Sequence, residues 1–179
     1  MQIPVLGELH LGELFPNSLV TPKEINEFLA TFRNESDRGA VLALAAAFDE
    51  VLARAIRKHL KQSEPGDKLL DKVFDFNGSL GTFSGRIDMA RCLGLINPQC
   101  HADIHRIRKL RNEAAHHWSD FKLTDERVQQ FVDPLHSPIN VLTADPSTDP
   151  TAASVLLPPL TKLSFMAFHL LSIGASAAA

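Results

Sequence analysis

The stretch from Asp37 to Lys61, which reads DRGAVLALAAAFDEVLARAIRKHLK, decides the fold. Its apolar residues recur three and four positions apart, the spacing that places side chains on one face of an α-helix. These residues are Val41, Leu44, Ala45, Phe48, Val51, Leu52, Ala55, Ile56 and Leu60. Arginines and lysines lie on the other side or in the last turns, where a cation suits the helix dipole. The pattern predicts one long amphipathic helix that ends before Pro65-Gly66.

Shorter helices are expected on both sides of this one. Before it, Thr21-Pro22-Lys23-Glu24 combines a capping box with proline at the first helical position, so a helix begins there. After it, apolar spacing and capping residues predict helices over 67–74, about 82–95, 98–117 and the residues that follow a cap at Thr124. The sequence has no alternating strand pattern longer than a few residues. The predicted fold class is therefore all-α, a single-domain multi-helix bundle.

The prolines divide the C-terminal part of the chain. Six of the eleven lie between Pro134 and Pro159, a density that forbids a continuous helix and predicts a proline-rich loop over 136–159. A C-terminal helix over 160–173 is expected to pack on the bundle. The complete expected organisation is an N-terminal extension over 1–20, a helical core over 21–135, this loop, this helix and a frayed tail over 174–179.

The composition restricts the possible functions. The chain has 179 residues, of which 45 % are hydrophobic and 22 % are charged, and this excludes wholesale disorder. Because the formal charge is −3, any contact with nucleic acid needs a local basic patch. Two cysteines make no disulfide framework, and neither a signal peptide nor a bilayer-spanning stretch is evident. We expect a cytoplasmic protein that does not associate with membranes.

The unusual residues gather between His101 and His117. This segment holds four of the eight histidines and four arginines and lysines against two acidic residues. The candidates for a nucleic-acid or partner surface are His105, Arg106, Arg108 and Lys109. The alternative is a solvated helix face whose cations pair with acids on neighbouring helices. His101 and His105, one turn apart, are half of a zinc site, and with no third ligand evident we expect neither a metal nor a cofactor.

Two nucleic-acid functions fit parts of the same segment. Arg111 and His116 match the R-x4-H pattern of HEPN-type ribonuclease domains, a resemblance that implies metal-independent RNA cleavage in which Asn112 orients the site. However, five residues on a regular helix place two side chains about 140° apart, and a structural role for these residues is the alternative. A helix-turn-helix over 86–106 would offer Gln99, His101, His105 and Arg106 to DNA. An ordinary αα-hairpin inside the bundle is equally consistent with this sequence pattern.

Two segments together resemble the mannitol operon repressor (MtlR-like) family. The first runs from Gly78 to Ile96 and includes Gly-Ser-Leu-Gly-Thr-Phe-Ser-Gly-Arg-Ile; the second runs over 107–126 and includes Leu-Arg-Asn-Glu-Ala-Ala-His. The resemblance implies a non-enzymatic bacterial regulator that lowers expression of a sugar-alcohol uptake operon. It is expected to work as a homodimer and through a regulatory protein, such as a component of the sugar phosphotransferase system. DNA contact is possible, but no clear reading element is present. An HEPN-related RNA-binding or RNA-cleaving module is the alternative.

The first segment also has a physical interpretation of its own. Gly78 and Gly81 allow a sharp turn, and Phe83 is expected to anchor the following helix. Arg86 lies about one turn later and is predicted to form an internal ion pair with Asp75 or Glu113. These polar and small residues are therefore expected to serve the architecture.

Overall fold

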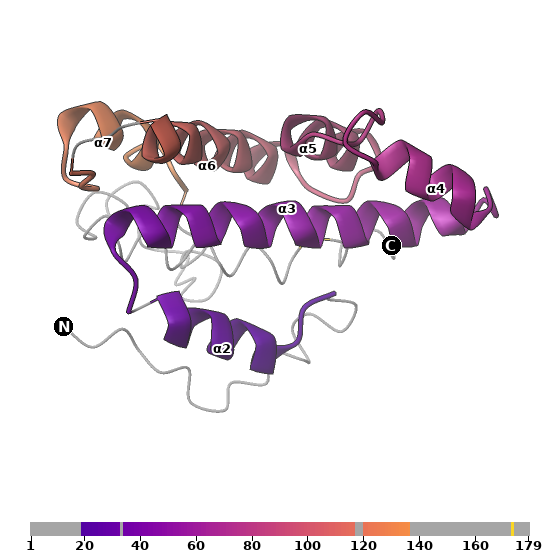
Figure 1. The fold of residues 1–179 in the computed structure, drawn as a ribbon, viewed down its shortest axis with the longest axis horizontal. Coiled ribbons are helices and arrows are strands. Elements are labelled where there is room, and N and C mark those ends of the chain that lie inside the picture. Colours follow the sequence, from indigo (N-terminus) through magenta and orange to yellow (C-terminus); the bar gives the residue numbers. More distant parts are fainter. Residues whose placement is uncertain (1–18, 33, 117–119, 137–172, 174–179) are drawn as a thin grey trace, which may run out of the picture.

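The computed structural model describes residues 19–32, 34–116, 120–136 and 173. All regular structure in these ranges is helical, which confirms the predicted all-α class. The central element is α3 (Asp37–Lys61), a 25-residue helix. Figure 1 shows α4, α5, α6 and α7 along one side of α3 and α2 along the other. Helix α3 contacts α5, α6 and α2, so it forms the middle layer of the bundle.

The bounds of α3 are those that the sequence predicts. Its N-terminus is capped by Ser36, whose hydroxyl accepts a hydrogen bond from the Gly39 N–H at 3.1 Å. The predicted apolar stripe is buried, except that Leu60 is partly buried against the core. Burial of this face, rather than helix propensity alone, stabilises a helix of this length.

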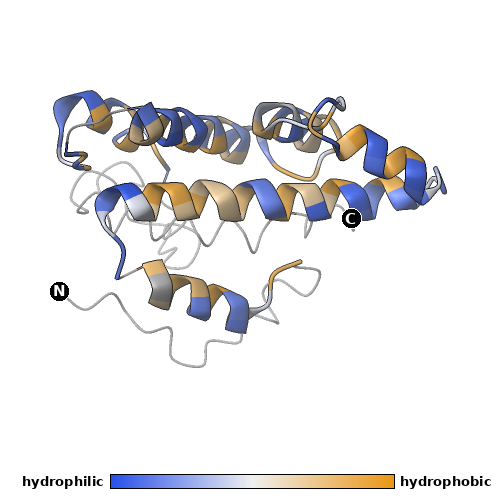
Figure 2. Cartoon of the chain, in the orientation of Figure 1, coloured by the Kyte–Doolittle hydropathy of each residue, from blue (hydrophilic) through white to orange (hydrophobic). Residues whose placement is uncertain are grey.

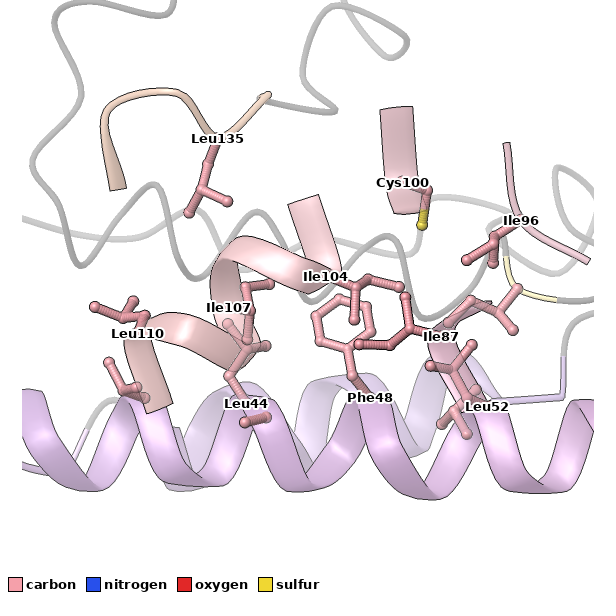
Figure 3. Close-up of a cluster of buried hydrophobic side chains, with 14 of the residues drawn as sticks. Leu44, Phe48, Leu52, Ile87, Ile96, Cys100, Ile104, Ile107, Leu110 and Leu135 are labelled. Carbon is pink, nitrogen blue, oxygen red and sulfur yellow. The ribbon is translucent and has the colours of Figure 1, made fainter. Parts of the chain in front are cut away.

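The largest interface of the core lies between α3 and α6 (Pro98–His116). In Figure 3, Ile104 and Ile107 of α6 point toward Phe48 and Leu44 of α3, with Ile87 beside them. These five side chains expose at most 1 % of their surface. Loss of a large side chain from such a site costs about 2–5 kcal/mol, so this seam holds the two helices together.

Helix α2 (Pro22–Phe32) begins with the predicted capping box. The Thr21 N–H donates to the Glu24 carboxylate at 2.7 Å, and the Glu24 N–H donates to the Thr21 hydroxyl at 3.2 Å. Ile25, Leu29 and Phe32 are buried, as expected for the face that packs on α3. A short capped helix is thereby fixed on the face of α3 opposite α6 (Figure 1).

Helix α4 (Asp67–Phe74) has its predicted bounds, whereas α5 (Phe83–Cys92) ends three residues earlier than predicted. The cause is Gly94, whose φ of +71° stops the helix. The Gly94 N–H donates to the Arg91 carbonyl at 3.1 Å and the Leu95 N–H donates to the Ala90 carbonyl at 2.9 Å, the pair of bonds that defines a Schellman motif. Leu95 and Ile96 are then buried as part of the turn into α6.

The start of α6 was predicted correctly and the start of α7 (Glu126–Val132) was not. The Asn97 side chain accepts from the Cys100 N–H at 2.8 Å, as expected of a cap. The N-cap position of α7 is occupied by Asp125 rather than by the predicted Thr124, and the Asp125 side chain makes no capping hydrogen bond to the helix. The difference arises because Thr124 lies inside a turn in which the Asp125 N–H donates to the Lys122 carbonyl at 3.1 Å.

Several predicted segments lie outside the described residues. They are the extension over 1–18, the proline-rich loop over 137–159 and the C-terminal helix apart from Ile173, together with the tail. Ile173 itself is fully buried and belongs to the core cluster. None of the helices in the described ranges is long and apolar enough to cross a membrane.

Candidate functional site

The loop between α4 and α5 is closed by its own backbone. The Gly78 N–H donates to the Asp75 carbonyl at 2.7 Å and the Leu80 N–H donates to the Val73 carbonyl at 2.9 Å. A Cβ on Gly78 would lie 2.3 Å from the Val73 carbonyl oxygen, and one on Gly81 would lie 2.4 Å from that of Asp75. Both positions therefore require glycine. The loop buries Leu80 in the core and leaves Phe76 exposed.

Arg86 joins this loop to α3. Its Nε donates to the Leu80 carbonyl at 2.8 Å, and its Nη1 pairs with the Asp49 carboxylate of α3. An internal ion pair was predicted, but the partner is Asp49 and neither Asp75 nor Glu113. The reason is the packing of α5 directly on α3, while the Asp75 carboxylate accepts a hydrogen bond from the Phe76 N–H. Phe83, the predicted anchor, is partly buried against the core.

Asp88, also on α5, meets two histidines of α6. Its Oδ1 lies 2.9 Å from Nε2 of His101 and 2.9 Å from Nε2 of His105. The two imidazole rings stand edge to face, with centroids 4.6 Å apart. Hydrogen bonds from His101 and then His105 lower the pKa of Asp88 below its usual range. We call these three residues the Asp88 cluster.

A second carboxylate of α6 is turned into the protein. Asp103 is fully buried, and its Oδ1 accepts from Nη1 of Arg106 at 2.8 Å. Nδ1 of His136 lies 3.1 Å from both Asp103 oxygens and links the residues after α7 to α6. A buried carboxylate needs such partners, since an unpaired buried charge is strongly unfavourable. Arg106 therefore serves the interior as well as the surface.

The four predicted surface residues consequently differ in their surroundings. His105 belongs to the Asp88 cluster, and Arg106 pairs with Asp103. Nε of Arg108 is buried and, in the described part of the chain, has no hydrogen-bond partner. Lys109 is exposed. Figure 2 shows that the ribbon of α6 is largely hydrophilic, but its cationic character is partly neutralised by these carboxylates of the same chain.

The R-x4-H residues do not form a joint site. Helix α6 is regular through Arg111 and His116, so their side chains point about 140° apart. Nη1 of Arg111 donates to the Asn112 side-chain oxygen at 3.3 Å, and His116 is exposed at the last residue of the helix. Within the described ranges, no hydrogen bond or ion pair links Arg111 to His116. The arrangement does not support a ribonuclease centre within one chain.

Contacts within the chain also weaken the helix-turn-helix alternative. Three of the four side chains that it would offer to DNA bind carboxylates of this chain: His101 and His105 bind Asp88, and Arg106 binds Asp103. The turn and the two helices form an αα-hairpin of the bundle. Sequence reasoning did not single out Asp49 or Asp88, and the only signal for the latter was the one-turn spacing of His101 and His105.

Comparison with known proteins places the fold. No protein-family model matches the chain, and no curated protein matches it. A chain of the X-ray structure of the MtlR–HPr complex from Escherichia coli superposes with a TM-score of 0.58 at 21 % sequence identity. The superposition covers 86 % of the present chain and 98 % of that chain. The protein is therefore an all-α helical bundle, and its fold is similar to that of MtlR, as the two sequence segments predicted.

Proposed function

We propose that this chain is a regulator that acts by binding a protein of the sugar phosphotransferase system. The observation that carries the proposal is the similarity in fold to MtlR, which was solved in complex with HPr, over nearly all of that chain. The two MtlR-like segments support it, because they build the α4–α5 loop, α5 and α6. Repression of a sugar-alcohol operon is the regulatory outcome that the sequence resemblance implies.

Protein contact is favoured over direct reading of DNA. The formal charge of −3 gives no general attraction to phosphate backbones. On α6, His105 and Arg106 bind Asp88 and Asp103. These two side chains are therefore engaged within the chain rather than available for the phosphate contacts that would position a recognition helix.

Phe76 is the candidate anchor for the partner. Its side chain is 85 % exposed on the loop that Gly78 and Gly81 hold closed. Because the loop backbone is already hydrogen-bonded, little backbone freedom is lost on binding, and aromatic residues dominate interface energetics. Exposed Leu69 of α4 precedes it by seven residues.

A shallow hollow of about 340 Å³ lies beside this anchor and mixes both signs of charge. It is lined by Arg57, Asp71, Lys72, Phe74 and Asp75. The Arg57 guanidinium stacks 4.2 Å from the centre of the Phe74 ring and pairs with Asp71 at 3.1 Å. An apolar anchor next to fixed charges is the arrangement of a specific protein interface. We assign HPr contact to this α4–α5 loop surface.

Calorimetric titration of the chain with HPr encoded in the same genome tests the proposal. We expect saturable binding that Phe76→Ser weakens by about tenfold or more. Leu42→Ser is the matched control, because Leu42 is an exposed hydrophobic residue on α3, and it should bind as the original chain does. No binding to HPr would contradict the proposed partner. Binding that Phe76→Ser leaves unchanged would contradict the assigned surface.

Two further experiments test the alternative functions, DNA binding and RNA cleavage. A DNA fragment from upstream of the gene should show no binding that falls steeply with salt, since such a fall reports phosphate contacts. Single-stranded and structured RNA should stay intact in chelator; cleavage lost in both Arg111→Ala and His116→Ala would establish the ribonuclease alternative. Light scattering at several concentrations tests the homodimer that the sequence resemblance implies, and a monomer at every concentration would exclude it.

A further inference from the structure

We propose that the Asp88 cluster binds a divalent transition-metal ion of the Zn²⁺ class. One carboxylate oxygen and two imidazole nitrogens lie within 4.8 Å of one another, and each residue offers one ligand atom. The ligands come from two helices, α5 and α6, that pack against each other. Only two of the ligands, His101 and His105, are recognisable from their helical spacing, which is why no metal was expected. The packing of α5 on α6 supplies the third ligand, Asp88.

The three ligand types suit zinc. Imidazole nitrogen and carboxylate oxygen are ordinary zinc ligands, and three protein ligands with an open fourth position are a known arrangement. In a tetrahedral site with bonds of about 2.0–2.1 Å, neighbouring ligand atoms lie about 3.3 Å apart. The two Asp88 Oδ1 to histidine Nε2 distances are 2.9 Å. The two histidine ligand nitrogens lie at most 4.8 Å apart. Side-chain rotations that lengthen the two 2.9 Å distances and bring the Nε2 atoms to about 3.3 Å from each other would convert the hydrogen-bonded cluster into a coordination site.

The two histidines carry their ring protons on different nitrogens with and without a bound metal ion. Without metal, each Nε2 can donate its hydrogen to the shared Asp88 oxygen, which explains why one carboxylate faces two imidazoles. Coordination requires a lone pair on each Nε2, so the remaining ring proton of each neutral imidazole resides on Nδ1. The Asp88 carboxylate, already ionised, binds the ion without losing a proton of its own.

The position of the cluster leaves it accessible. The Asp88 side chain is 59 % exposed, and those of His101 and His105 are 30 % and 23 % exposed. An ion can reach the site from solvent, and a water molecule can occupy the fourth position. A bound ion would link α5 to α6 and stabilise the folded chain by mass action.

Calorimetric titration of the tag-free full chain with ZnCl₂, after treatment with chelator, tests the site. We expect one ion to bind with an affinity that His101→Ala, His105→Ala and Asp88→Asn each lower by about tenfold or more. Two matched controls should bind as the original chain does: His116→Ala, an exposed histidine at the other end of α6, and Cys92→Ser, one turn after Asp88 on α5. Unchanged zinc affinity in a His101→Ala/His105→Ala double variant would overturn the assignment.

Two additional measurements keep the result interpretable if a variant is destabilised. Circular dichroism establishes that each variant is folded before titration. Co²⁺ absorption on the original chain reports the ligands directly: nitrogen and oxygen coordination is expected, whereas a strong thiolate charge-transfer band would contradict the ligand set. Loss of zinc binding in Cys92→Ser would also contradict the assigned ligand set. Absence of any site-specific binding to the original chain would end the proposal.

Discussion

Arg86 and Asp88 are two residues apart on α5, yet they belong to opposite regions of the molecule. Two residues on an α-helix differ by about 200°, so one side chain faces α3 and the other faces the surface beside α6. Arg86 is 15 % exposed and pairs with Asp49, whereas Asp88 is 59 % exposed and meets two histidines. One stretch of sequence thus supplies both an internal contact that holds the fold and a surface cluster that can take a ligand.

The difference shows why a segment that resembles a known family is by itself a poor guide to reactivity. Gly78, Gly81 and Arg86 shape the α4–α5 loop and its attachment to α3. Asp88, by contrast, contributes little that the bundle needs, because an exposed ion pair adds only about 0–1 kcal/mol. We expect the inward residues to affect stability and the outward residues to affect binding.

The contrast between inward and outward residues should be strongest in the reactivity of the two cysteine thiols. Cys92 is exposed on α5, whereas Cys100 is buried on α6, and burial together with the charge of Asp103 raises the pKa of Cys100 to about 12. Because the thiolate is the nucleophile, the buried Cys100 should react far more slowly at pH 8 than the exposed Cys92. Ellman's reagent should label one thiol per folded chain and two in denaturant. Equal labelling rates for both thiols in the folded protein would contradict this packing.

Removal of Arg86 should have the largest effect on stability. Arg86→Ala leaves the Asp49 carboxylate and the Leu80 carbonyl without their partner, and we expect the free energy of unfolding to fall by about 3 kcal/mol. Asp88→Asn is the matched control on the same helix and should change it by about 0.5 kcal/mol or less. Urea unfolding of the metal-free variants measures both. Similar losses in the two variants would remove the distinction between the faces of α5.

A methyl group at Gly78 should have a smaller but clear effect. Gly78→Ala places its Cβ against two backbone carbonyl oxygens, at 2.3 and 2.4 Å, so the loop must shift at a cost of about 2 kcal/mol. Gly66→Ala serves as control: its Cβ meets nothing within 4 Å, and only its φ of +80° resists alanine. We expect about 1 kcal/mol there. If the two substitutions cost the same in urea unfolding, close packing is not what Gly78 provides.

The capping residue Glu24 should give the smallest, pH-dependent effect. Hydrogen bonds from the Thr21 backbone and side chain lower the pKa of Glu24 below its usual 4.5. A lowered pKa in the folded state stabilises the protein above the unfolded-state pKa, and this contribution disappears as pH falls through the folded-state pKa. Glu24→Gln should cost about 0.5 kcal/mol at pH 7 and nearly nothing at pH 3. Urea unfolding at both pH values measures the change, and a cost independent of pH would contradict the origin in charge.

Local signals predicted much of the fold. The apolar spacing from Val41 to Leu60 was strong enough to give both ends of α3, and the capping chemistry at Thr21 and Asn97 gave the starts of α2 and α6. The end of α5 was missed because Gly94 was counted as helical rather than as a left-handed cap. Each local error reflects turn chemistry, not the hydrophobic pattern.

Contacts between distant residues could not be predicted in the same way. Asp49 precedes Arg86 by 37 residues, and nothing in the local sequence distinguishes it from Asp75 as a partner. Likewise, the pair His101 and His105 was visible, but Asp88 joins them only after α5 folds back on α6. The candidate site thus depends on packing geometry that a single sequence does not contain.

A double-mutant cycle on Arg86 and Asp49 tests the central claim most directly, namely that Arg86 of the first MtlR-like segment holds α5 on α3 through Asp49. Urea unfolding of Arg86→Ala, Asp49→Ala and the double variant gives the coupling free energy between the two side chains. We expect a coupling of about 2 kcal/mol, with the double variant scarcely less stable than the worse single one. A coupling below about 0.3 kcal/mol would contradict the claim.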